Sequence, residues 1–143
     1  MISNSSKYAI KAVLFLAVHS SEENKIMVKD IAEPINVPQP YIAKLLQELA
    51  KRKLISSTRG PKGGFYLSEA DVNRNIMEIV HVIDGEKKLN ACFLSLEHCN
   101  EKNPCPVHHL INASRATMMK NLKGKLIKDL VLDVKNGKGK LPL

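Results

Sequence analysis

Three cysteines and a histidine form the densest group of reactive side chains in the sequence. Cys92, Cys99 and Cys105 are the only cysteines and lie within fourteen residues, and His108 adds an imidazole three residues later. Thiolate and imidazole ligands suit an iron–sulfur cluster or zinc. The pattern lacks the Cys-x2–4-Cys pair typical of structural zinc sites, although spacing alone does not exclude zinc. We therefore expect a metal centre, and we favour a cluster because wide spacing on a loop can wrap a bulky group.

Other interpretations of these cysteines stay open. An odd number of cysteines, in a chain that we expect to lack a secretory signal, argues against a disulfide framework. Unrelated thiols are the ordinary explanation for scattered cysteines. A cysteine-dependent enzyme would need an orienting residue and an oxyanion motif, and neither accompanies the histidine. We therefore expect that the chain is not an enzyme.

A helix and then a long loop lead to the cysteines. Asn75 and Glu78 have the spacing of an N-cap and N3 pair, which predicts a helix through Asp84 that Gly85 ends. Residues 87–104 show little periodicity. A loop of that length in a compact domain is usually functional.

Two helices are predicted after the cysteines. Pro106 suits the first turn of a long helix that runs to about Leu122, before Gly124. Its apolar stripe is incomplete: Val107, Leu110, Ile111, Met118 and Leu122. A final short helix is predicted by Leu126, Ile127, Leu130 and Val131.

Two short amphipathic helices joined by a tight turn precede this region. Apolar residues recur at helical spacing in 28–35 and, after the turn 36–38, in 42–49. Such a pair suggests a helix-turn-helix, whose second helix can enter the DNA major groove. Residues 55–58 and 64–67 then predict two strands around a basic, glycine-rich tip. Backbone at such a tip can approach a phosphate chain closely.

The distribution of charge favours a polyanionic partner. The chain has a formal net charge of +8 and a pI near 9.5. Residues 44–62 hold six basic residues and one acidic residue, a net charge of +5 on the predicted second helix and wing. Aromatic residues make up only 4% of the chain, which argues against stacking platforms for single-stranded nucleic acid.

The first helix is predicted from an apolar stripe near the start of the chain. Its members are Tyr8, Ala12, Val13, Leu16 and Ala17, and Ser5 or Ser6 is expected to cap it. The apolar run 12–18 is short for a signal peptide, and no stretch reaches the ~20 residues needed to span a bilayer. We therefore expect a cytoplasmic protein with no membrane partner.

The whole sequence resembles the Rrf2 family of winged-helix bacterial regulators, of the IscR, NsrR and CymR type. The most specific matching stretch is Arg59-Gly60-Pro61-Lys62-Gly63-Gly64-Phe65, at the wing. Other matches are Lys7-Tyr8-Ala9, Lys29-Asp30-Ile31-Ala32-Glu33, Tyr41-Ile42-Ala43-Lys44-Leu45-Leu46, Leu54-Ile55, the helix end at Ile83-Asp84-Gly85, and the cysteine loop.

The resemblance implies a mostly α-helical fold with three parts. Residues 1–85 would form a winged helix-turn-helix domain with a small two-stranded wing, and 86–105 a cluster-binding loop. Residues 106–143 would hold a long dimerisation helix, a short final helix and a basic tail. The implied function is a homodimeric transcription regulator, such as a repressor, that reads a pseudo-palindromic duplex operator and has no small-molecule substrate.

The resemblance also implies the ligands of the metal centre. Cys92, Cys99 and Cys105 would hold a two-iron–two-sulfur or four-iron–four-sulfur cluster, with His108 as the fourth ligand, as in IscR-like members. NsrR-like members use an acid near the start of the first helix, but this chain has no Asp or Glu before Glu22. His98 and His109 remain alternatives to His108. The signal would be iron–sulfur status, redox state or nitric oxide.

The DNA contacts implied by the resemblance lie on the second helix and the wing. Base-edge candidates are Gln39, Tyr41 and Lys44; Lys51 and Lys62 would meet phosphate, and Arg59 would reach the minor groove from a tip that includes Gly60 and Gly63. Ala43 stands where IscR has a base-reading Glu, so IscR-like site preference should not be transferred. The first alternative to a cluster sensor is a metal-free or zinc-bound regulator that responds to thiol oxidation or to a protein partner.

Overall fold

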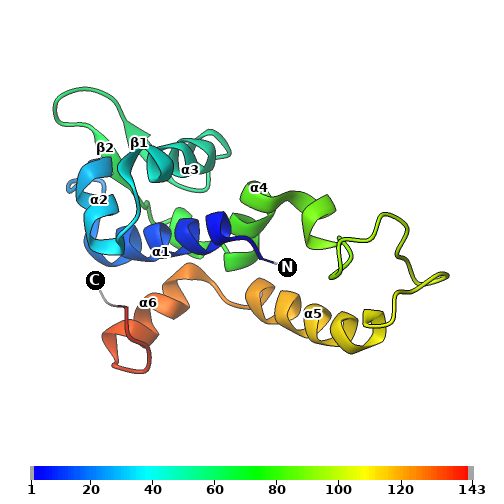
Figure 1. Ribbon diagram of the computed structural model, residues 1–143. Helices are drawn as coiled ribbons and strands as arrows, with labels where there is room; N and C mark the ends of the chain where they lie inside the picture. The colour runs from blue at the N-terminus through cyan, green and yellow to red at the C-terminus, as the bar shows by residue number, and fades with distance from the viewer. Residues whose placement is uncertain (1, 142–143) are drawn as a thin grey trace.

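The chain folds into helices arranged around a central helix, with one small antiparallel sheet (Figure 1). The computed structural model describes residues 2–141. The elements in order are α1 (Asn4–His19), α2 (Val28–Ile35), α3 (Gln39–Lys51), β1 (Ser56–Thr58), β2 (Gly64–Tyr66), the 3-10 helix η1 (Asp71–Asn73), α4 (Ile76–Leu89), α5 (His108–Lys123) and α6 (Ile127–Lys135). Within the described residues, no helix combines the length and apolar character that a membrane crossing needs.

The hydrophobic core surrounds α1, which contacts α2, α3, α4 and α6. Its fully buried side chains include Leu16 of α1, Ile31 of α2 and Leu46 of α3. The predicted helical stripes of α2 and α3 are confirmed, since Ile31, Ala32 and Ile35 are buried, as are Ile42, Leu46 and Leu49. This packing fixes the opposite face of α3 toward solvent.

The wing is the sheet formed by β1 and β2. Ser56 pairs with Tyr66 and Thr58 with Gly64, and the Ile26 backbone adds two hydrogen bonds to Phe65. Both strands are one residue shorter than the sequence predicted, and Ile55 and Leu67, the residues left outside them, are buried.

The start of α1 differs from the prediction that Ser5 or Ser6 caps it. Ser3 is the N-cap, and its hydroxyl accepts a 3.1 Å hydrogen bond from the Ser6 backbone N–H. Ser6 is itself completely buried within the helix. The cap therefore lies two residues earlier than the first of the predicted positions.

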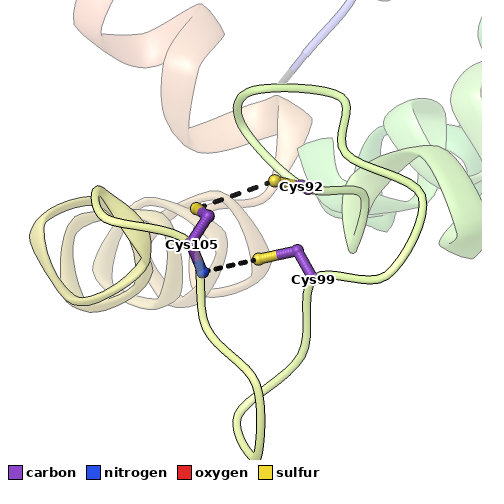
Figure 2. Close-up of side chains that lie close together, drawn as sticks. All are labelled: Cys92, Cys99 and Cys105. Carbon is purple, nitrogen blue, oxygen red and sulfur yellow. Dashed lines mark hydrogen bonds between the residues drawn. The ribbon is translucent and has the colours of Figure 1, made fainter.

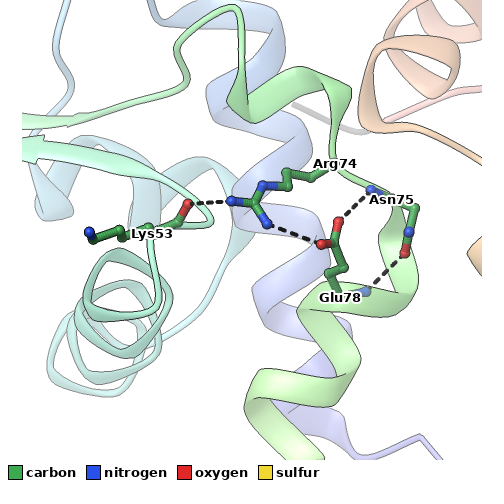
Figure 3. A network of polar contacts seen from close by, with 4 residues as sticks. All are labelled: Lys53, Arg74, Asn75 and Glu78. Atoms are coloured by element: carbon green, nitrogen blue, oxygen red, sulfur yellow. Dashed lines mark hydrogen bonds and ion pairs between the residues drawn. The ribbon is translucent and has the colours of Figure 1, made fainter.

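A capping box begins α4, as the sequence predicted. The Glu78 backbone N–H donates to Asn75 at 3.1 Å, and the Glu78 carboxylate accepts from the Asn75 backbone N–H at 2.9 Å (Figure 3). Glu78 also pairs with Arg74 at 3.1 Å, and Arg74 donates to the Lys53 carbonyl just after α3. The network therefore connects the start of α4 to the end of α3.

The end of α4 contains a kink that the sequence interpretation took for the end of the helix. Gly85 leaves the helical conformation with φ 74° and ψ 161°, a backbone shape that glycine adopts readily. A last helical turn, residues 86–89, then follows, and the buried Leu89 packs near Met77 and Val80. The long loop consequently begins at residue 90 rather than at Lys87.

The helix α5 begins at His108, two residues after the predicted first turn at Pro106. The His108 backbone N–H donates to the Cys105 carbonyl at 3.0 Å, so Pro106 occupies the second position of a β-turn. Proline favours that position because its φ is preset. None of the α5 side chains is buried within the chain, and Leu110 is 72% exposed.

Candidate metal centre and nucleic-acid interface

The loop between α4 and α5 brings all three cysteines together. Their Sγ atoms lie within 4.8 Å of one another. Cys92 and Cys105 are separated by 3.7 Å, and the Cys105 backbone N–H donates to Cys99 Sγ at 3.3 Å (Figure 2). The loop lies at the end of the molecule opposite the wing (Figure 1). The fourteen residues from Cys92 to Cys105 therefore fold back on themselves and bring three sulfur atoms into one site.

The thiols of Cys92 and Cys99 do not ionise alike. Burial raises the pKa of the Cys92 thiol, but hydrogen bonds from the Leu96 and Leu94 backbones and from the other thiols lower it to about 7. The Cys105 backbone N–H lowers the pKa of Cys99, yet burial and the neighbouring thiols outweigh it, so that pKa is raised. A metal binds the deprotonated thiolate, so Cys92 is better prepared than Cys99 to bind a metal.

His108 is the histidine that the fold brings to the cysteines. Its Nδ1 lies 3.6 Å from Cys99 Sγ, and its Nε2 is buried with no hydrogen-bond partner. His109 is exposed and stacks edge-on against His108, with ring centroids 5.3 Å apart, while His98 is exposed on the loop. Burying a ring nitrogen without a hydrogen-bond partner costs free energy. A metal bound by this nitrogen, or an acceptor for its N–H, would remove that cost.

The sequence interpretation missed the polar residues of α5 that lie at this site beside His108. The cavity that holds the cysteines and His108 is also lined by Asn112 and Arg115 of α5. These side chains follow His108 by four and seven residues, which places all three on one face of the helix. Their helical spacing was visible in the sequence, but the sequence did not show that the loop folds back onto this face of the helix.

The donor set fits the two candidate metal centres to different degrees. Three thiolates and one imidazole match the ligands of iron–sulfur clusters and of zinc. A tetrahedral ion with metal–sulfur bonds of about 2.3 Å holds its sulfur ligands about 3.8 Å apart. The distance between Cys92 and Cys105 is close to that value. A cluster that takes each thiolate on a different iron would need wider spacing than the 3.7 Å between these two sulfurs.

The opposite end of the molecule presents a basic, exposed surface. The charged and polar side chains predicted to contact DNA from α3 and the wing are all exposed. They are Gln39, Tyr41, Lys44, Lys51, Arg59 and Lys62. The wing and α3 border a groove that is lined by Gln47, Lys51, Ser57 and Arg59, among others. Cations along a groove of this kind suit a phosphate backbone.

Two glycines determine the shape of the wing tip. Gly60 has φ 104°, which favours glycine, and its carbonyl accepts a 2.9 Å hydrogen bond from the Gly63 N–H. A Cβ at Gly63 would lie 2.3 Å from the Thr58 carbonyl oxygen. Arg59 and Lys62, at this tight turn, are both exposed.

Tyr41 has contacts that the sequence interpretation did not anticipate. Its hydroxyl forms a hydrogen bond with Ser5, and its ring meets Tyr8 edge-on, with centroids 5.8 Å apart. Tyr41 nevertheless remains 38% exposed. The first turn of α1 thus holds Tyr41 in place on the outer face of α3.

The chain resembles known proteins in both sequence and fold. Residues 2–133 match the family model Rrf2, described as "Iron-dependent Transcriptional regulator". A protein of Aquifex aeolicus described as an HTH-type transcriptional regulator is 32% identical over 92% of this chain and 91% of its own length. The regulator NsrR of Bacillus licheniformis is 26% identical, covering 92% of each chain. The structure of IscR from T. potens superposes with a TM-score of 0.72 at 22% identity, over 99% of this chain and 93% of that one.

Proposed function

The chain belongs to the Rrf2 family of transcriptional regulators, and on this premise we propose that it reports the state of an iron–sulfur cluster to duplex DNA. The family and these relatives are transcriptional regulators, not enzymes. The observation that carries the proposal is the convergence of three cysteine sulfurs within 4.8 Å beside α5, a helix that buries none of its side chains.

The proposed DNA contacts divide between α3 and the wing. Exposed polar groups near the start of α3 read base edges in the major groove: Gln39, Tyr41 and Lys44. The cations Lys51, Arg59 and Lys62 meet phosphates or the minor groove, and Gly60 and Gly63 let the wing backbone approach the DNA closely. The net charge of +5 over residues 44–62 supports this assignment.

The proposed cluster ligands are Cys92, Cys99, Cys105 and His108. The proximity of the three sulfurs and the buried, unpartnered Nε2 of His108 support this set. When bound, such a cluster supplies a redox-active group that oxidants and nitric oxide can attack. The chain itself contributes the closed loop, the low-pKa thiol of Cys92 and the shielding of the sulfurs.

The proposed dimer forms through α5. Sixteen residues of this helix bury no side chain within the chain, and Leu110 is 72% exposed. A stable helix normally buries an apolar stripe, so α5 requires a partner surface, which we assign to a second copy. Two copies would then present two wings to the halves of a pseudo-palindromic operator in the cytoplasm.

The site and the dimer helix share residues, which explains how occupancy can change DNA binding. His108 lies in the first turn of α5, so a metal centre bound by the cysteines and His108 would constrain the position of that helix. Ligand binding shifts an equilibrium only by its different affinities for the two arrangements. Loss or oxidation of the centre would thus change the spacing of the two wings.

A zinc-bound regulator of the same fold is the second candidate. The 3.7 Å distance between Cys92 and Cys105 favours it, because a single tetrahedral ion needs such a spacing. A metal-free thiol switch would use the same pair of sulfurs.

Anaerobic purification followed by iron, sulfide and zinc assays tests the proposal. We expect a coloured protein that contains iron and acid-labile sulfide, and we expect Cys105→Ser to lose both. A colourless wild-type protein with stoichiometric zinc would replace the cluster proposal with the zinc alternative.

A further inference from the structure

Arg115 is a half-buried cation whose Nε atom has no hydrogen-bond partner within the described residues. Its Nε is buried and has no hydrogen-bond partner, and residues 2–141 contain no ion pair that involves its guanidinium. The side chain lines the same cavity as Cys92, Cys99 and Cys105. Arg115 also shares one face of α5 with His108, whose Nε2 is the other unpartnered nitrogen of this cavity.

The unpartnered guanidinium of Arg115 would be stabilised by an anion in this cavity. Leaving a buried guanidinium N–H without an acceptor costs free energy, and the cost is larger than for a neutral group. The residues that line the cavity include no Asp or Glu: they are Asn90, Cys92, Phe93, Cys99, Cys105, His108, Ile111, Asn112 and Arg115. The only groups there that become negative are the three thiols.

We propose that Arg115 is a positioning residue of the metal centre, which donates hydrogen bonds to its sulfur atoms and offsets its negative charge. This inference rests on the proposed function, because it assigns Arg115 to the same cluster. Hydrogen bonds to the sulfurs and nearby charge are recognised determinants of cluster potential. A fixed positive charge stabilises the reduced, more negative form, so Arg115 raises the reduction potential.

The inference also explains why arginine occupies this position on α5. Its planar guanidinium presents several N–H groups in a fixed fork, so one side chain can reach more than one sulfur. Lysine has the same charge, but its single ammonium group lacks that geometry. Arg115→Lys should therefore keep part of the effect on potential, and Arg115→Gln should lose the charge-dependent part.

The experiment compares four proteins loaded with iron and sulfide without oxygen: wild type, Arg115→Gln, Arg115→Lys and the matched control Lys120→Gln. Lys120 is an exposed cation on the same helix and does not line the cavity. We expect Arg115→Gln to lower the midpoint potential and to speed iron release to a chelator about 10- to 100-fold. Arg115→Lys should lie between it and wild type, and Lys120→Gln should match wild type.

The outcomes separate this inference from the proposed function. Loaded wild-type protein with an Arg115→Gln variant of equal potential and release rate would overturn the role of Arg115 alone. Wild-type protein that takes up no iron and sulfide would overturn both. Thermal unfolding of the metal-free proteins checks that each variant folds. If Arg115→Gln does not fold, the midpoint potential of Arg115→Lys tests the inference instead. A potential equal to that of wild type, although lysine lacks the guanidinium fork, would overturn the positioning role of Arg115.

Discussion

The Asp84 carboxylate accepts a 2.9 Å hydrogen bond from the Ser3 backbone N–H and a second one from the Ser3 hydroxyl. These residues are 81 positions apart, and the contact joins the kink of α4 to the first turn of α1. The same hydroxyl accepts from Ser6 and caps α1. One pair of side chains therefore connects the helix before the cysteine loop to the central helix of the fold.

Asp84→Asn should make stability less dependent on acid pH. Burial raises the pKa of this carboxyl, but the Ser3 hydrogen bonds and Lys88 bring it below the usual 3.8. A lowered pKa stabilises the fold above pH ~4, and this contribution is lost as the pH falls through the folded-state pKa. Urea unfolding from pH 7 to pH 3 should show a loss at low pH in wild type that Asp84→Asn largely lacks. Parallel curves for the two proteins would contradict the prediction, and the exposed Glu22→Gln is the control.

The helices α2 and α3 could be predicted because each buries a regular stripe. The helical spacing of Ile31, Ile35, Leu46 and Leu49 reflects one core that all of them enter. The helix ends depend on distant partners instead. Ser3 rather than Ser5 or Ser6 caps α1 because Asp84 holds it from the other side, which local sequence does not reveal.

Gly63→Ala should deform the wing tip without affecting the metal site. The added Cβ would meet the Thr58 carbonyl oxygen at 2.3 Å, so the turn must shift and Arg59 must move with it. We expect DNA affinity to fall about tenfold, which corresponds to about 1.4 kcal/mol. Gly139→Ala, where a Cβ meets no atom within 4 Å, is the control. Equal affinities of the two variants would show that the tip does not approach DNA.

Arg59→Ala should weaken DNA binding and make it less sensitive to salt. Each phosphate-neutralising cation releases counterions, so the slope of log affinity against log salt should fall by about 1 for each Arg59 that contacts DNA. Fluorescence anisotropy at several salt concentrations measures the slope. The control is Lys135→Ala, which removes a cation of α6, a helix that lies across α1 from the wing (Figure 1), and it should leave the slope unchanged. An unchanged slope in Arg59→Ala would count against the wing contact.

His108→Ala should leave a cluster that is lost easily. His108 lies 3.6 Å from Cys99 Sγ, whereas His98 and His109 are exposed. We expect iron release to a chelator to accelerate about tenfold or more in His108→Ala, and to stay near wild type in His98→Ala and His109→Ala. If His109→Ala released iron fastest, the fourth ligand would be His109.

The sequence predicted only those residues of the site that lie close together along the chain. Three cysteines within fourteen residues predicted a metal centre, since a loop that short keeps the thiols close to one another. Arg115 was missed because local sequence does not show that the loop folds back onto the face of α5 that His108 and Arg115 share. Pro106 suggested an earlier start of the helix, but it occupies a β-turn.

The affinity of loaded and cluster-free protein for one duplex tests the central claim most directly. The duplex is first selected from a random pool with the loaded protein, and both forms are then titrated at one salt concentration. Coupling energies of 1–3 kcal/mol are typical of allosteric proteins, so we expect the two dissociation constants to differ by about 5- to 150-fold. Equal dissociation constants, for protein with measured iron and sulfide and for the same protein after their removal, would contradict the claim that this centre controls DNA binding.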